Sequence, residues 1–428
     1  MPPDIAVPPF SSHAAREALL SEAHARPFFR LEAPARILAF AFLRGEAGAE
    51  ELRARLDAFA QAHGVSPAPQ GARHHRLALP HGLFRWEEHT EFTSYVFMLS
   101  GEAARLDLSG GEVLRLIALP EQPGPHLVSV DLSVVSESEG EAALSHVKSG
   151  VVSLSSFEGG RARVASDFTP DEAGFVRFVI VNRELSDRGL GALARNVMEV
   201  EFYRMLALLG LPEAQRLGPI IREIERGLAD LAGDLVHQRT LEEGDALLMR
   251  LTDMTARIEA EIARTTFRFG ATRAYGAILA DRLKLFDVPA SGEAPAIASF
   301  LDRRNAPALR TCERMEANLA DLAARLTRAS SLLRTRIDVE LAKQNNALLA
   351  SMSERTRLQL RLQQTVEGLS VAAISYYVVG LAAYLLKGVK EGGLLPVPLD
   401  LAVGITVPAA VLAIALVVRR IRNRHGGV

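Results

Sequence analysis

Cysteine is almost missing from this sequence: Cys312 is the only one in 428 residues. A lone cysteine excludes an internal disulfide and any metal centre built from several thiolates. It also fits a reducing compartment. The first residues, MPPDIAVPPF, lack the basic and apolar regions of a signal peptide. We therefore expect the part of the chain that precedes its apolar C-terminal runs to be cytoplasmic.

Lysine is scarce, and basic patches are missing. The 49 basic residues are almost all arginine, which we interpret as codon bias in a GC-rich genome. The net charge is −2, and aromatic residues do not interleave with the arginines. The sequence therefore predicts no nucleic-acid partner.

Signatures of catalysis are missing as well. The chain has no Gly-rich phosphate loop and no GxGxxG, GxSxG or CxxC motif. We predict that the protein is not an enzyme, and the only cofactor left to consider is a divalent cation.

Long uncharged runs are present near the C-terminus. Gly368–Leu386 and Leu401–Val418 contain 19 and 18 residues without a formal charge. A bilayer core needs roughly 20 apolar residues in a helix. The Gly- and Pro-rich stretch 387–400 is too short to be a domain. The runs predict two transmembrane helices with a short connection, and the alternative is a buried helical hairpin of a soluble core.

The charges that flank these runs predict their orientation. Basic residues cluster outside both runs, at Arg355, Arg357, Arg361, Arg419, Arg420, Arg422 and Arg424. The connecting stretch holds only Lys387 and Lys390, beside Glu391 and Asp400. By the positive-inside rule, both termini lie in the cytoplasm. We expect a bacterial inner-membrane protein with the lipid bilayer as its partner.

The chain before these runs divides into two parts. Residues 1–187 alternate short apolar runs with amphipathic segments, which predicts a cytoplasmic α/β domain with a largely antiparallel sheet. Residues 188–366 have helical spacing, which predicts a helical or coiled-coil stalk. Residues 367–420 form the predicted hairpin and 421–428 a basic tail. The fold class is therefore α+β.

The stalk contains one very long predicted helix. Asn305 and Pro307 are a plausible helix start, and no Gly or Pro follows from Ala308 to Glu367. Apolar residues alternate three and four apart, the spacing of a coiled-coil seam, and then continue at longer steps. They are Cys312, Met315, Leu319, Leu322, Leu326, Leu333, Ile337, Leu341 and Leu348. A helix with one apolar stripe needs a partner, which favours a homo-oligomer.

Polar residues recur on one face of the first apolar run. Glu367, Ser370, Tyr377 and Tyr384 are spaced three, seven and seven residues apart. They are candidate pore-lining residues, with Glu367 attracting cations at the cytoplasmic mouth. Gly380 and Gly388 are candidates for close helix packing. The alternative is that the tyrosines mark the interfaces, the serine bonds to the backbone, and Glu367 marks the membrane boundary.

One predicted strand is rich in charge. In FRWEEHTEFTSYVF, residues 84–97, one face would carry Arg85, Glu87, His89 and Glu91. Glu87, His89 and Glu91 are candidate ligands of a divalent cation, although no fixed-spacing metal signature is present. The alternative is a solvated, charge-paired strand face. His24 and Arg26 are interpreted as structural.

Several stretches together resemble a known family. They are SEAHARPF (21–28), FRWEEHTEFTSYVF (84–97), YRMLALLGLP (203–212), FRFGATRAY (267–275), LLRTRIDVELAKQNNALLASM (332–352) and RLQLRLQQTVEGLSVAAISYYVVGLAAYLLKG (357–388). The chain is similar over residues 13–425 to a bacterial family of membrane-anchored proteins, the domain of unknown function 3422. This resemblance implies no assigned activity and no catalytic residues.

The predicted architecture also resembles the CorA-type magnesium transporters. The shared features are a cytoplasmic α/β domain, a stalk helix that continues into the first of two spans, and a basic C-terminus. The resemblance implies a pentamer with the first span lining the pore. Where that family has a Gly-Met-Asn triplet, this sequence reads LLKGVKEGG.

Two functions follow as hypotheses. In the first, the protein oligomerises and conducts a cation along the first span. In the second, it is a non-conducting scaffold or regulatory protein whose cytoplasmic domain binds a partner.

Overall fold

A computed structural model describes most of the chain. It covers residues 11, 13–16, 30–45, 48–145, 147, 151–237, 240–287, 294–391 and 398–425. The chain divides into two compact units, Met1–His237 with Met249–Ala329, and Gln238–Leu248 with Ser330–Val428. We call the first the sheet unit and the second the tail unit. The stretch with His24 and Arg26 lies outside the described residues.

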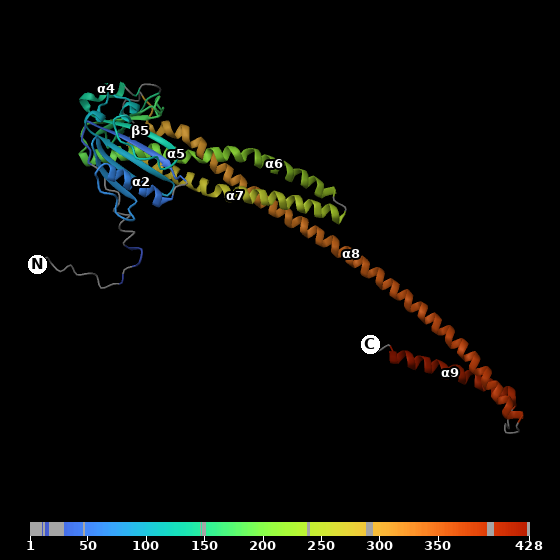
Figure 1. The fold of residues 1–428 in the computed structure, drawn as a ribbon. Coiled ribbons are helices and arrows are strands. Elements are labelled where there is room, and N and C mark those ends of the chain that lie inside the picture. The colour runs from blue at the N-terminus through green and yellow to red at the C-terminus, as the bar shows by residue number, and fades with distance from the viewer. Residues whose placement is uncertain are drawn as a thin grey trace. The chain divides into compact units, whose positions relative to one another are not determined.

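The sheet unit is built on one mixed sheet (Figure 1). Its strands are β1 (Ala35–Leu43), β2 (His74–Leu79), β3 (Gly82–Glu88), β4 (Phe92–Leu99), β5 (His126–Ser136), β6 (Ser153–Phe157), β7 (Ala162–Ser166), β8 (Val176–Asn182) and β9 (Phe286–Asp287). Their order in the sheet is β2-β3-β4-β1-β5-β8-β7-β6-β9. Only the β5–β8 pair among these strands is parallel. The predicted α+β class and largely antiparallel sheet are therefore confirmed.

Short helices and one long helix cover the sheet. They are α2 (Ala49–Ala62), the 3₁₀ turns η1 (Gly101–Ala104) and η2 (Glu137–Glu139), α3 (Gly110–Val113), α4 (Gly140–Ser145) and α5 (Asp187–Leu208). On one face, side chains such as Ile37 and Leu132 pack with Leu193 of α5. On the other face, Leu38 and Trp86 belong to the same cluster as Leu56 of α2. Successive strand residues point to opposite faces, so the central strands are apolar on both sides.

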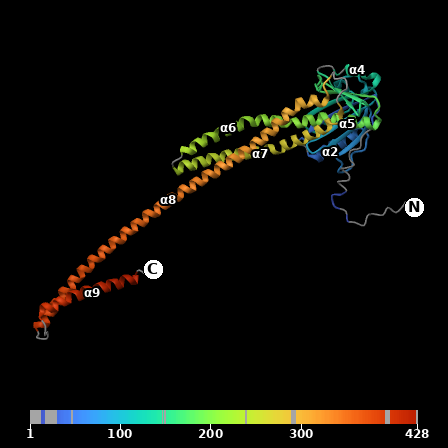
Figure 2. The same cartoon turned by 180° about the vertical axis from the view of Figure 1, so that it is seen from behind.

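Three long helices complete the sheet unit. α6 (Gly210–His237) and α7 (Leu241–Leu283) lie side by side, and the first part of α8 (Ile297–Glu391) follows them (Figures 1 and 2). The chain breaks between α5 and α6, and Gly210 begins α6. Pro212 is tolerated there because the first turn of a helix leaves backbone N–H groups unbonded anyway.

The start of α8 corrects a prediction. The helix begins at Ile297, and Pro307 lies inside it. Ile297, Phe300 and Leu301 are buried in the main cluster of the sheet unit. Tertiary packing therefore extends the helix upstream of the Asn305 and Pro307 signal.

The predicted seam of α8 is buried only in part. Cys312, Leu319, Leu322 and Leu326 are buried within the sheet unit. The sole cysteine is therefore a core residue, and its burial raises the pKa of the Cys312 thiol. In the tail unit, Leu333 is buried, but Leu341 and Leu348 are exposed.

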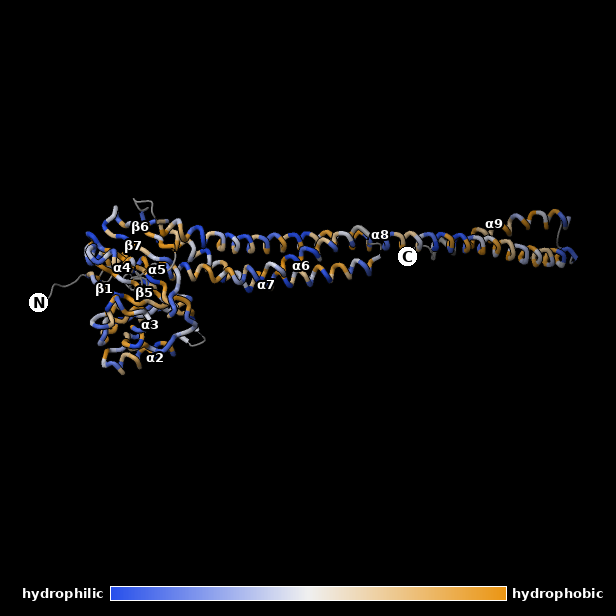
Figure 3. Tube along the Cα trace, turned by 90° about the horizontal axis from the view of Figure 1, so that it is seen from above, coloured by the Kyte–Doolittle hydropathy of each residue, from blue (hydrophilic) through white to orange (hydrophobic). Residues whose placement is uncertain are grey.

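The tail unit contains two helices long and apolar enough to cross a membrane. They are the C-terminal part of α8 and α9 (Leu399–His425), and Figure 3 shows α9 as largely hydrophobic. In the most apolar 18-residue stretch of each helix, 6% of the residues are buried for α8 and none for α9. α8 extends to Glu391, so residues 387–391, predicted as loop, are helical. Pro408 and Gly404 lie inside α9.

Candidate functional site

The predicted polar stripe lies on an open face of α8. Tyr377 and Tyr384 are 70% and 79% exposed, and Ser370 is exposed as well. The Ser370 hydroxyl donates a hydrogen bond of 2.8 Å to the Val366 carbonyl. Glu367 is half-buried. One chain therefore encloses no path along this stripe, and its role in lining a pore stays a prediction.

A groove between α8 and α9 is lined by Val371, Ser375 and Val379, and also by Tyr377 and Tyr384 of the predicted stripe. Val371, Ser375 and Val379 recur every four residues and are the less exposed positions of the span. The Ser375 hydroxyl is buried and has no hydrogen-bond partner among the described residues. Ser375 is not among the site residues predicted from the sequence. The small and β-branched residues at these four-residue steps were the signal that could have identified this groove.

The two candidate packing glycines, Gly380 and Gly388, do not pack closely against another part of the described chain. At Gly380 and Gly388, an added Cβ would meet no described atom within 4 Å. Gly380 instead lines an open groove of about 880 Å³ together with Tyr376 of α8 and Val407 of α9. Close packing at these glycines stays a prediction for a contact with another chain.

The flanking arginines are exposed where their side chains are described. This holds for Arg355, Arg357 and Arg361 before the first apolar run, and for Arg419 and Arg420 after the second. The side chains of Arg422 and Arg424, within α9, are outside the described set. Their use as membrane-flanking charges stays a prediction.

The charged strand motif is a hairpin rather than one strand. β3 ends at Glu88 and β4 begins at Phe92, so Glu91 does not follow Arg85 along a single strand. Arg85 is buried and forms an ion pair with Glu87. The expected charge pairing is therefore present, but the expected solvation is wrong for Arg85, because α5 covers this side of the hairpin.

The carboxylates of this motif are held by arginines. Glu91 pairs with Arg268 at 2.8 Å. The His89 ring stacks on Phe92 with centroids 4.0 Å apart, and its Nε2 lies 3.8 Å from Glu87. Among the described residues, no group of three His, Cys, Asp or Glu side chains is placed to hold a metal ion.

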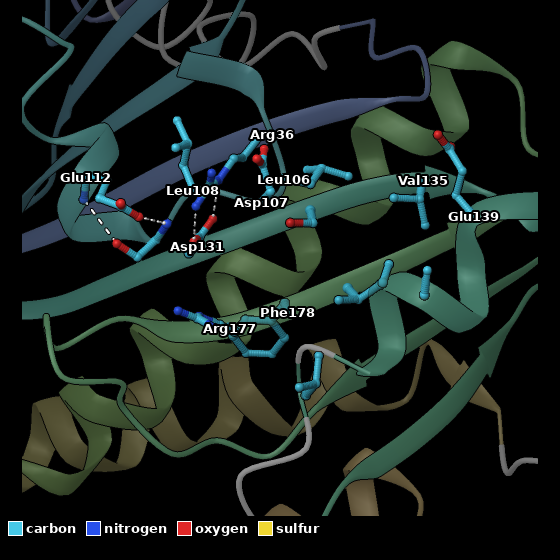
Figure 4. A pocket seen from close by; sticks show the side chains of 16 residues that line it. Arg36, Leu106, Asp107, Leu108, Glu112, Asp131, Val135, Glu139, Arg177 and Phe178 are labelled. Carbon is cyan, nitrogen blue, oxygen red and sulfur yellow. Dashed lines mark hydrogen bonds and ion pairs between the residues drawn. The ribbon is translucent and has the colours of Figure 1, made fainter. Parts of the chain in front are cut away.

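A second charged region lies in a cavity of about 510 Å³ (Figure 4). Arg36 on β1 donates to both carboxylate oxygens of Asp131 on β5, at 2.9 and 2.6 Å. It also donates to the Arg105 carbonyl at 2.5 Å. Both Arg36 and Asp131 are buried. A bidentate pair of this kind offsets the cost of burying each charge.

Arg36 and Asp131 are not among the site residues predicted from the sequence. Arg36 and Asp131 are single charges inside otherwise apolar strands, ARILAFAFL and HLVSVDLSVV. An isolated charge in a buried strand needs a partner. Two such strands, each with one charge of opposite sign, were therefore a signal for pairing.

Comparison with known proteins gives one result. The profile of a family described as "Protein of unknown function (DUF3422)" matches residues 11–425. No curated protein matches the chain.

Proposed function

We propose that this member of the DUF3422 family is anchored in a bacterial inner membrane by its two apolar helices. The supporting observation is the exposure of large apolar side chains on these helices, for example Leu381 at 66% and Leu412 at 64%. Water disfavours contiguous apolar surface of this extent, and a bilayer removes that cost.

The proposed orientation places both termini in the cytoplasm. Arginines flank the two apolar runs on their outer sides, and the short connection carries only two lysines. Positively charged residues are retained on the cytoplasmic side of inner-membrane spans. The sheet unit would then lie in the cytoplasm.

In this proposal the hairpin holds the protein at the membrane without conducting, and the sheet unit does the binding. Ser370 satisfies its hydroxyl within its own helix, as expected of a residue that need not face water or an ion. The sheet unit, by contrast, contains a cavity with buried charged side chains. We ascribe no catalytic activity to it.

Cell fractionation tests the anchor. Full-length chain should remain in the membrane pellet after washing with high salt and with carbonate, and should be released by detergent. A chain that ends at Val366 should move to the soluble fraction. Release of the full-length chain by salt alone would contradict the proposal, because peripheral electrostatic attachment is screened by salt.

A cation-conducting oligomer is the second candidate. The observation that favours it is the exposure of Ser370, Tyr377 and Tyr384 in the single chain, because subunits arranged around an axis could bring these residues together. The exposed apolar residues of α8 before the span, such as Leu341 and Leu348, would pack between the subunits.

Two measurements separate the candidates. A mass determination in mild detergent comes first, because two spans of one chain cannot enclose a channel. For an oligomer, ion flux into proteoliposomes would be compared for wild type, Glu367→Ala and Tyr377→Phe. Flux that falls in both variants would favour conduction, and the absence of flux under any cation gradient would favour the anchor.

A further inference from the structure

The cavity of the sheet unit is a gap between two coverings of one sheet face. α2 packs over β1, β3 and β4 through an aromatic cluster. α4 packs over β5 and β8, where Ala143 joins a cluster with Val135 and Val179. Between these clusters, the strands β1, β5 and β8 form the floor of the cavity (Figure 4).

The floor is a row of charges on three neighbouring strands. Asp131 on β5 is directly opposite Arg177 on β8. β1 lies on the other side of β5. There Arg36 is directly opposite Ser133, which places Arg36 diagonally across from Asp131. The lining is mixed, and its apolar residues include Leu106, Leu108 and Val147. A volume of about 510 Å³ lies within the range of roughly 300–1,000 Å³ usual for small-molecule sites.

Most charges around this cavity are paired. Arg36 pairs with Asp131, and Arg177 pairs with Asp171 at 2.9 Å. At the rim, Arg105 pairs with Asp107 at 2.5 Å. These three pairs leave no net charge.

Two glutamates of the lining remain. Glu112 and Glu139 have no Lys or Arg within ion-pair distance among the described residues, and Figure 4 shows them at opposite ends of the cavity. Each is instead the third residue of a capping box, with Ser109 and Ser136 respectively. Hydrogen bonds from Ser109 lower the pKa of Glu112, which keeps this carboxylate ionised at neutral pH. The described residues of the lining therefore carry a net charge of about −2.

We propose that this cavity binds a linear aliphatic diamine. One ammonium group lies near Glu112 and the other near Glu139, and the methylene chain lies along the apolar side chains of the lining, such as Leu106 and Leu108. A metal ion fits less well, because Ca²⁺ and Mg²⁺ need several oxygens that converge on one point. A dicarboxylate or phosphate compound is disfavoured by the negative charge of the lining. This inference concerns the sheet unit and is independent of membrane anchoring.

Titration calorimetry on the full-length chain in a non-ionic detergent tests the proposal. The probes are a series of linear diamines from ethane to octane, with the monoamine, diol and dicarboxylate of the same length as controls. Affinity should pass through a maximum along the series, since only one span fits both carboxylates. The best diamine should bind about three- to fivefold more tightly than its monoamine, which forms only one of the two ion pairs.

The variants are chosen to keep the fold. Glu112→Gln and Glu139→Gln remove a charge while glutamine still completes each capping box. Each should weaken diamine binding about three- to fivefold, as expected of a partly exposed ion pair, and the double variant should multiply the two effects. Glu141→Gln is the matched control, because Glu141 lies beside Glu139 on α4 but outside the lining.

Several results would overturn the proposal. Equal binding of the diamine and its diol would show that charge does not matter. Equal effects of Glu141→Gln and Glu139→Gln would reduce the interaction to general surface attraction. Absence of binding across the whole series would refute it outright.

Discussion

Leu132 on β5 and Leu348 on α8 have the same side chain, yet the first is 0% exposed and the second 60%. The difference extends over the two units. In the sheet unit, apolar residues from strands, α5 and the start of α8 share one cluster. In the tail unit, apolar residues continue along α8 and α9 with little to cover them. Similar composition thus produces a self-contained core in one unit and a surface that requires another environment in the other.

Charges differ between the units in the same way. Arg36 and Asp131 form a buried bidentate pair in the sheet unit, whereas Lys343 and Glu340 form an exposed pair at 3.3 Å in the tail unit. Buried pairs resist loss of one partner far more strongly than exposed pairs do. Perturbations of matched residues in the two units should therefore have very different effects.

The largest effect is expected from charges in the apolar helices. The double variant Leu381→Arg/Leu412→Arg places one arginine in each proposed span, at a cost of about 2.5–3.5 kcal/mol per residue at the centre of a span. The variant should be largely lost from the membrane fraction after fractionation. Leu360→Arg, on the exposed part of α8 before the span, should leave this fraction unchanged. Equal retention of both variants would end the anchor proposal.

Removing one partner of the buried pair should come next. Asp131→Ala leaves the Arg36 guanidinium buried without its carboxylate, which should lower the free energy of unfolding by about 3–5 kcal/mol. Glu340→Ala in the tail unit should change it by less than about 0.5 kcal/mol. Urea unfolding of the full chain in detergent measures both.

The double variant Arg36→Met/Asp131→Leu serves as the control for this pair. Replacing both charges with apolar side chains removes the unpaired charge, so much of the stability should return. If the double variant were as unstable as Asp131→Ala, the loss of stability would not come from an unpaired buried charge. The ion pair itself would then contribute to the free energy of unfolding.

Truncation of the two leucines compares the units directly. Leu132→Ala should cost about 2–5 kcal/mol, because it removes a fully buried side chain and leaves a cavity. Leu348→Ala should cost less than about 0.5 kcal/mol in the isolated chain. A cost above about 1 kcal/mol for Leu348→Ala that grows with protein concentration would instead indicate that another subunit covers this stripe.

The smallest effect concerns pH and a pair that joins α6 to α7. Arg216 donates to both oxygens of Glu261, at 3.1 and 2.6 Å, and these hydrogen bonds lower the pKa of Glu261. The folded state then releases this proton more readily than the unfolded chain does. The stabilisation is fully present above the unfolded pKa of about 4.3 and is lost as pH falls through the lower folded pKa.

Glu261→Gln should therefore cost about 0.5–1 kcal/mol at pH 7 and much less in strong acid. Denaturant unfolding at both pH values measures this. A cost that does not change with pH would assign the effect to packing rather than to charge.

Much of the fold could be predicted from local patterns. The short apolar runs and amphipathic segments of residues 1–187 and the uninterrupted segment after Ala308 all follow from periodicity and from Gly and Pro positions. The start of α8 could not be predicted, because Ile297 and Phe300 are held in the helix by packing against the core of the sheet, which is distant in the sequence. The hairpin at residues 89–91 was missed because it contains no glycine or proline that would mark the turn.

The candidate sites also differ in how far the sequence could predict them. Spacing alone put Ser370, Tyr377 and Tyr384 on one face, and the structure leaves that face open. The face toward α9, with Ser375, depends on which side of α8 the second helix occupies. The cavity of Arg36 and Asp131 joins residues 95 positions apart and depends on the strand order.

The sequence by itself determined the α+β class and the two long apolar helices, because hydrophobic periodicity and uncharged length are local properties of the chain. Only the tertiary structure decided which apolar residues are covered and which charges are neutralised. Those outcomes depend on contacts between strands and helices far apart in the chain, and the free energy of a leucine or a carboxylate is set by what surrounds it.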